Sequence, residues 1–179
     1  MKGRLLGCVA AVGLSAALFG CVADGNKVEM DMQAAAGHAD GIMDTTLAGI
    51  EPPVQWAHGP TTTGSCGVTR RRSVMTIVSD ERRGSFLGLV ERNWRKRDYK
   101  IKGINNDQDS PAIYAQTRGG FGVSLIFGGG QAFFEVDSPC VEESEVAEST
   151  TAPNGPPYDG VYPLPRPNVH SDFWSAGAS

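Results

Sequence analysis

Long apolar runs, histidine and cysteine are all scarce in this chain of 179 residues. The one long apolar stretch, residues 5–19, is too short to cross a bilayer comfortably, because a membrane-spanning helix needs about 20 apolar residues. The three histidines are His38, His58 and His170, and they lack the paired spacing of zinc ligands. We therefore expect neither a metal site nor an ordinary transmembrane helix.

Recognisable catalytic motifs are missing as well. The serine in "TGSCG" lacks the Gly-x-Ser-x-Gly pattern of a nucleophile elbow. The glycines of "RGGFGVSLIFGGG" are not followed by the Gly-Lys-Ser/Thr of a phosphate-binding loop, and their flanks are typical of strands. No pair of carboxylates stands out for hydrolysis. We expect a protein without enzymatic activity or cofactor, and a hydrolase with an unrecognised site is the alternative.

The first twenty residues are typical of a secretory signal. Lys2 and Arg4 precede the apolar stretch, and a small residue stands before Cys21. The ending "LFGC" resembles the lipobox of bacterial lipoproteins, in which cleavage leaves the cysteine N-terminal and lipid-modified. The resemblance implies that residues 1–20 are removed, and that at least two acyl chains on Cys21 hold the protein on the outer face of the plasma membrane. An uncleaved membrane helix is the alternative.

Export decides how the remaining cysteines are interpreted. Cys8 leaves with the signal and Cys21 carries lipid, so that only Cys66 and Cys140 remain for the folded domain. Cysteine pairs outside the cytoplasm usually form disulfides, and we predict one between these two residues. Two buried free thiols are the alternative.

Hydrophobic periodicity predicts one α+β domain over residues 28–142. Helical spacing recurs over residues 28–50 and again from about residue 80, where Phe86, Val90 and Trp94 share one face. Strand-like runs occupy residues 54–57, 65–79, 98–104, 112–117, 121–127 and 131–137. Short glycine-rich breaks between the last three runs favour hairpins. We expect two layers, with two helices on one face of an antiparallel sheet of about five strands.

The two ends of the mature chain differ from the domain in composition. Residues 21–27 are expected to be a short lipidated tether. Residues 143–179 are first acidic and then rich in proline and glycine, which is typical of irregular structure. Four aromatic residues in this tail indicate that part of it docks onto the domain: Tyr158, Tyr162, Phe173 and Trp174.

The formal net charge is −4, but the charges are unevenly distributed. Basic residues gather between residues 70 and 102, whereas residues 135–148 contain acidic residues and no basic ones. We predict one positive face for an anionic partner, which could be lipid headgroups, a wall polymer or an acidic protein, formed by Arg70, Arg71, Arg72, Arg92, Arg95 and Lys96. Nucleic acid is excluded as a partner by export. Ordinary solvated charges are the alternative.

Several stretches carry a wider resemblance. Together with the lipobox, "TRRRSV", "ERRGSFLGLVERNW", "QAFFEVDSPC" and "NVHSDFW" resemble small actinobacterial lipoproteins of uncharacterised function, and more loosely LppA-type lipoproteins of mycobacteria. The resemblance covers most of the mature chain and implies a location, but it brings no catalytic residues. We therefore expect a lipid-anchored, non-enzymatic binding or structural module of the cell envelope, with an envelope hydrolase as the alternative.

Overall fold

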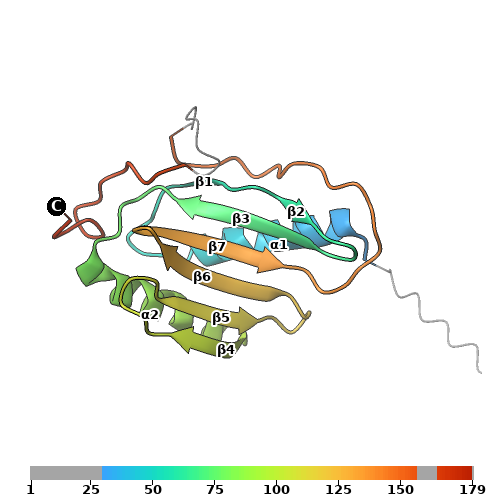
Figure 1. Cartoon of the computed structure of the whole chain (residues 1–179), viewed down its shortest axis with the longest axis horizontal. Helices are drawn as coiled ribbons and strands as arrows, with labels where there is room; N and C mark the ends of the chain where they lie inside the picture. The colour runs from blue at the N-terminus through green and yellow to red at the C-terminus, as the bar shows by residue number, and fades with distance from the viewer. Residues whose placement is uncertain (1–29, 157–164, 179) are drawn as a thin grey trace, which may run out of the picture.

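A computed structural model describes residues 30–156 and 165–178 and shows an α+β fold (Figure 1). The predicted signal sequence, Cys21 and the tether lie outside the described residues. Along the chain the elements are α1 (Met32–Leu47), β1 (Trp56–His58), β2 (Thr62–Thr63), β3 (Val68–Val74), α2 (Asp80–Lys96), β4 (Lys100–Asn105), β5 (Ala112–Gln116), β6 (Gly122–Gly128) and β7 (Gln131–Asp137).

All the strands belong to one antiparallel sheet. Its order is β1-β3-β7-β6-β5-β4, and β2 also pairs with β3. Strands β4 to β7 form a meander whose last strand pairs with β3, from Thr69 opposite Asp137 to Ser73 opposite Phe133. The chain reaches the far edge of the sheet from β3 by way of α2. The sheet has seven strands where about five were expected, and the short β2 was not foreseen.

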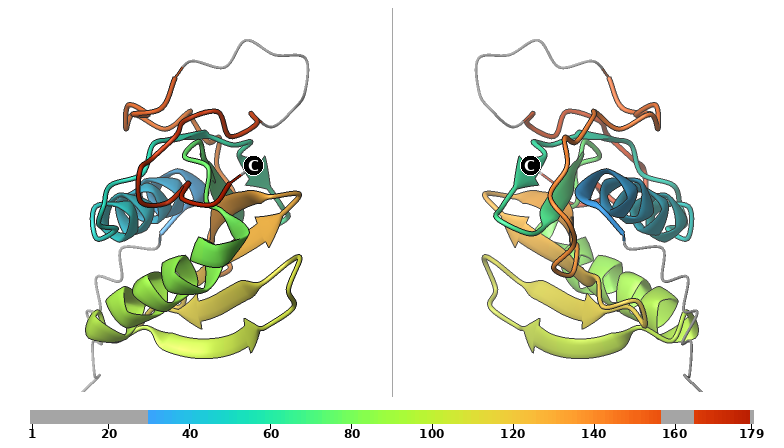
Figure 2. Two further views of the ribbon diagram at one scale, coloured as in Figure 1. Left: turned by 90° about the vertical axis from the view of Figure 1, so that its left-hand side faces the viewer. Right: turned by 90° about the vertical axis from the view of Figure 1, so that its right-hand side faces the viewer.

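Both helices cover the same face of the sheet, as predicted (Figure 2). Helix α1 packs on β3 and β7, and α2 packs on β4 and β5. The carboxylate of Asp31 caps α1 by accepting a hydrogen bond of 2.7 Å from the backbone N–H of Ala34. Acidic residues begin α2 and basic residues end it, which complements the helix dipole. The opposite face of the sheet carries no described helix.

The hydrophobic core lies between the helices and the sheet. The apolar face of α2, formed by Phe86, Val90 and Trp94, is buried as its spacing predicts. The ring of Phe86 packs edge-on against Phe127 of β6 and against Trp174 near the C-terminus, with centroid distances of 5.9 and 5.0 Å. The core therefore includes a residue from the C-terminal segment.

That segment is held by backbone and side-chain hydrogen bonds. The indole N–H of Trp174 donates to the carbonyl of Pro52 at 2.7 Å, and Ser175 Oγ donates to the carbonyl of Ile77 at 2.7 Å. Val169 forms a parallel bridge with Thr76. Residues after 165 thus pack on the loop before α2 and on the loop after α1.

Cys66 and Cys140 form a disulfide, as predicted, and their Cα atoms lie 4.8 Å apart. The backbone N–H of Val141 donates to the carbonyl of Cys66 at 2.7 Å. The bridge joins the turn before β3 to the segment after β7, and it closes a loop across 74 residues of sequence.

Candidate functional site

The predicted basic cluster falls into two separate parts in the structure. Arg70 and Arg72 lie on the helix-facing side of β3 and are only 4% and 0% exposed. The prediction that they join an exposed positive face is therefore wrong. Strand alternation places them on the same side as Val68 and Val74, and that side faces α1.

Two carboxylates of α1 make this burial possible. Arg72 Nη1 lies 2.6 Å from Asp44 Oδ1, and Arg70 Nε lies 3.4 Å from Asp40 Oδ2. A guanidinium without such a partner would be strongly destabilising in this position. Burial lowers the pKa of Arg72, and the hydrogen bond and charge of Asp44 oppose that change.

Trp56 of β1 covers the Arg72 guanidinium, whose central carbon lies 3.9 Å from the ring centroid. Arg71 points to the opposite side of the sheet, where it forms an ion pair with Glu135 of the neighbouring strand β7. None of the three strand arginines therefore presents an uncompensated charge to solvent.

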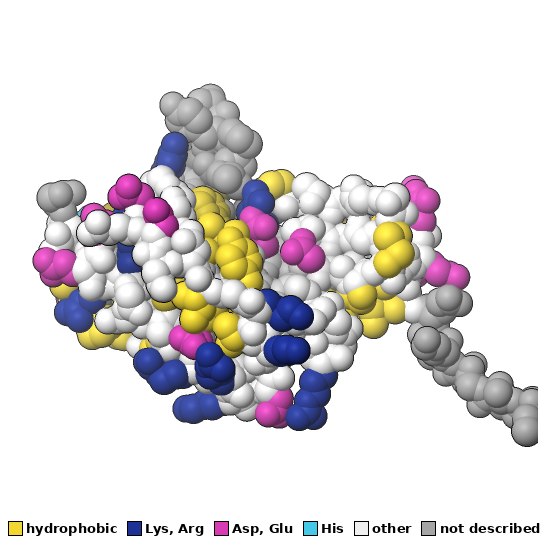
Figure 3. Space-filling view, turned by 60° about the horizontal axis from the view of Figure 1, so that its bottom comes forward, with side chains coloured by type: hydrophobic (Ala, Val, Ile, Leu, Met, Phe, Trp, Pro, Cys, Tyr) yellow, Lys and Arg dark blue, Asp and Glu magenta, His cyan; other side chains and the backbone are white. Residues whose placement is uncertain are grey.

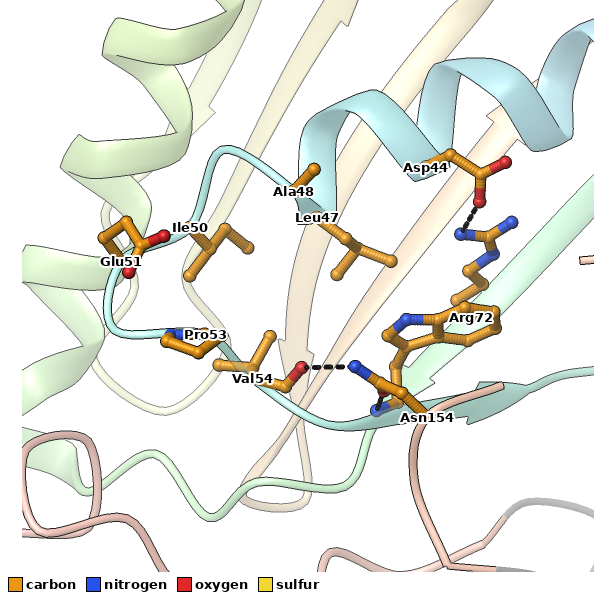
Figure 4. A pocket seen from close by; sticks show the side chains of 10 residues that line it. Asp44, Leu47, Ala48, Ile50, Glu51, Pro53, Val54, Arg72 and Asn154 are labelled. Atoms are coloured by element: carbon orange, nitrogen blue, oxygen red, sulfur yellow. Dashed lines mark hydrogen bonds and ion pairs between the residues drawn. The ribbon is translucent and has the colours of Figure 1, made fainter. Parts of the chain in front are cut away.

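A pocket of about 240 Å³ opens beside Arg72, and we call it the Arg72 pocket (Figure 4). Its lining comes from the end of α1, the following loop, β1, β3 and the segment that follows β7 in the chain. The lining residues are Asp44, Leu47, Ala48, Ile50, Glu51, Pro53, Val54, Trp56, Arg72 and Asn154. Asp44 and Arg72 point toward each other at one end, and Glu51 lies at the other.

Asn154 fixes the floor of the Arg72 pocket. Its Oδ1 accepts a hydrogen bond of 2.9 Å from the backbone N–H of Trp56, and its Nδ2 donates to the carbonyl of Val54 at 3.3 Å. Thr151, three residues earlier, donates its hydroxyl to Asp44 Oδ2 at 3.1 Å. Residues 151–154, which follow β7 in the chain, thus hydrogen-bond to α1, to β1 and to the loop before β1 around the pocket.

The helical part of the predicted cluster is exposed. Arg92, Arg95 and Lys96 face solvent on α2, opposite its buried face, as predicted. Further basic side chains follow on the connection to β4, on β4 itself and after β5, so that Lys and Arg gather along this side of the molecule (Figure 3). We define the α2–β4 basic surface as Arg92, Arg95, Lys96, Arg97, Lys100, Lys102 and Arg118, all of them exposed.

Few carboxylates neutralise the α2–β4 basic surface. Arg95 pairs with Glu91 at 2.6 Å, and Arg118 pairs with Asp98 at 2.9 Å. Within the described ranges the other five basic side chains form no ion pair. Arg97 instead donates to the side-chain oxygen of Asn93 and to a backbone carbonyl of α1. The surface therefore carries an excess of positive charge.

The histidines take part in no cluster. The Nε2 of His58 lies 2.8 Å from the carbonyl of Thr151, and the ring of His38 lies 4.8 Å from that of Phe121. In residues 30–156 and 165–178, no three His, Cys, Asp or Glu side chains gather as metal ligands do. The helices in those ranges also include none with the length and apolar character needed to span a membrane.

Comparisons with known proteins found no matching protein-family model, no matching curated protein and no matching solved structure. The geometry of the Arg72 pocket and of the α2–β4 basic surface is therefore the only basis for inferring what each of them does.

Sequence reasoning missed the α1 carboxylates, although a signal for them exists. Asp40 and Asp44 are one helical turn apart, a rise of about 6 Å, and two residues along a strand rise about 6.6 Å. The pair Arg70 and Arg72 therefore matches the carboxylate pair in spacing.

Proposed function

We propose that this protein is a lipid-anchored binding module of the cell envelope that uses the α2–β4 basic surface to hold an anionic partner. The observation that carries the proposal is the group of five exposed basic side chains that have no ion pair within the described residues. It is supported by the contrast with the whole chain, whose net charge is −4. The partner that fits best is a layer of anionic lipid headgroups.

The strength of such binding follows from the charges. A basic residue near an anionic membrane contributes about 1 kcal/mol, so five give at most about 5 kcal/mol, which corresponds to roughly 0.2 mM. That is weak for a free protein. An acylated Cys21 lies nine residues before Met30, and such a segment reaches at most about 30 Å. The anchor would raise the local concentration enough for weak binding to matter.

Vesicle binding tests the proposal directly. The chain from residue 21 onward, with Cys21→Ser to remove lipid, should bind phosphatidylglycerol vesicles at low salt and bind them more weakly at about 0.15 M salt, where the attraction is partly screened. It should not bind phosphatidylcholine vesicles. Equal and negligible binding to both would leave these side chains as ordinary solvated charges.

A matched pair of variants separates this surface from net charge. Arg92→Gln, Lys96→Gln and Lys100→Gln together should abolish binding. The control Ala34→Glu, Gln55→Glu and Thr63→Glu changes the net charge equally at exposed positions away from the surface, and it should retain most of the binding. Similar losses in both variants would point to non-specific attraction.

The anchor itself needs a separate test. Mass spectrometry of the protein from membranes should show a chain that begins with acylated Cys21. A Cys21→Ser protein that stays membrane-bound and unprocessed would indicate an ordinary membrane helix.

A further inference from the structure

The Arg72 pocket contains one hydrogen-bond donor that the fold leaves unused. Trp56 is only 6% exposed, and its indole N–H forms no hydrogen bond with any described residue. The indole N–H groups of Trp94 and Trp174, by contrast, donate to Thr46 Oγ1 and to the carbonyl of Pro52. The Trp56 nitrogen is not among the described buried atoms that are closed to solvent, so its N–H is open to a molecule in the pocket.

Arg72 lies beside this donor but offers the pocket no free donor of its own. Its side chain is fully buried and ion-paired with Asp44, and its Nε is closed to solvent, so a molecule in the pocket does not reach that nitrogen. A hydrogen-bond acceptor within the pocket would find the indole N–H of Trp56 on its lining.

The rest of the lining fixes the character of the molecule that fits. Leu47, Ile50 and Val54 supply apolar walls, and each is less than a tenth exposed. The volume of about 240 Å³ lies below the range of drug-sized sites, which begins at about 300 Å³. It suits a single ring or a short acyl group.

The charges decide between neutral and ionised ligands. Two arginines and two aspartates, Arg70, Arg72, Asp40 and Asp44, balance one another beside the pocket. A charged ligand would therefore lose part of its hydration without gaining an unbalanced opposite charge, which is costly. Glu51, at the end of the pocket away from Arg72, further disfavours anions.

We propose that the Arg72 pocket binds a small uncharged molecule, a ring or short acyl group that carries an amide or ester carbonyl, with the carbonyl oxygen accepting from the indole N–H of Trp56. The pocket shares no residue with the α2–β4 basic surface. This proposal is therefore independent of the proposed anionic partner, and either can fail alone.

Three probes of similar size test the selection by charge: benzamide, benzoate and benzylammonium. The readout is the indole N–H signals in ¹H–¹⁵N NMR spectra of the Cys21→Ser chain from residue 21 onward, with Trp56→Phe used to assign the Trp56 signal. Benzamide should shift that signal saturably, with a Kd of about 1 mM. The signals of Trp94 and Trp174 should stay in place, and both charged probes should bind at least about tenfold more weakly.

A second pair of variants locates the binding. Ala48 lines the pocket and is exposed, so Ala48→Phe should fill the space and abolish the benzamide shift. Ala34→Phe adds the same ring at an exposed position at the far end of α1 and should leave the shift unchanged. Unmoved Trp94 and Trp174 signals verify that both variants are folded. The proposal is overturned by any of three results: no saturable shift up to about 20 mM benzamide, equal binding of the three probes, or benzamide binding that survives Ala48→Phe.

Discussion

Removing the side chain of Trp174 tests whether the C-terminal segment is part of the folded domain. The side chain is 1% exposed, packs on Phe86, and donates to the carbonyl of Pro52. A tryptophan buries about 150–250 Å², which at about 25 cal/mol per Å² is worth about 4–6 kcal/mol. Partial collapse of the surroundings reduces this figure, so we expect Trp174→Ala to lower the free energy of unfolding by about 4 kcal/mol, within the usual range for such a truncation.

Urea denaturation followed by far-ultraviolet circular dichroism measures this change without relying on tryptophan fluorescence. Phe173→Ala is the matched control, because that neighbouring ring is 40% exposed and its loss should cost less than about 1 kcal/mol. Trp174→Phe keeps a ring against Phe86 but leaves the Pro52 carbonyl without its donor, which should cost about 1–3 kcal/mol. If Trp174→Ala unfolds at the wild-type urea concentration, the segment does not belong to the core and the reasoning is refuted.

Three further predictions concern stability. Replacing Cys66 and Cys140 by alanine opens the loop of 74 residues. It should lower the free energy of unfolding, measured by urea titration, by up to about 4.4 kcal/mol. A loss below about 1 kcal/mol would contradict the loop-entropy argument. Asp44→Leu leaves the fully buried Arg72 guanidinium without its nearest carboxylate and should cost about 3 kcal/mol. Adding Arg72→Met should restore most of that loss, and a double variant no more stable than the single one argues against the ion pair. Burial raises the pKa of the Tyr99 hydroxyl, so the folded state holds that proton more tightly than the unfolded chain. The contribution of this group to stability is complete below about pH 10 and is lost as the pH rises further. Tyr99→Phe should therefore reduce the loss of stability seen in urea midpoints measured above about pH 10. An unchanged alkaline profile in the variant would contradict this role of Tyr99.

The types of the main elements could be predicted because periodicity is a local property of the chain. The spacing of Phe86, Val90 and Trp94 is sufficient to identify the buried face of α2. The glycines at positions 120, 129 and 130 adopt positive φ in the turns before β6 and β7, as the hairpin interpretation of these breaks requires. Strand β2 pairs only through Thr62 and Thr63, and two residues are too few for a pattern.

The burial of Arg70 and Arg72 could not be read from β3 alone. Alternation groups them with the buried residues Val68 and Val74, but charged residues are normally exposed, and that expectation decided the prediction. What reverses it lies about 30 residues earlier, in the carboxylates that α1 places over the strand. Long-range pairing of this kind leaves only the matched spacing as a trace in the sequence.

The Arg72 pocket was unpredictable for a related reason. Its walls come from α1, the loop after it, two strands and Asn154, and no single stretch carries the pattern. Asn154 lies in a segment whose composition is typical of irregular structure. The hydrogen bonds that make it a structural residue exist only once β1 is in place beside it.

The pairing of β3 with β7 has a consequence for how the chain is made. β3 ends at Val74, but its partner is complete only at Asp137, and the core is closed by Trp174, still later in the chain. At about 5–20 residues per second, roughly 3–13 seconds of synthesis separate the two strands. Folding dominated by contacts this distant is intrinsically slow. During that interval one edge of β3 has no neighbour, so its backbone N–H and C=O groups on that side stay unpaired until β7 is made.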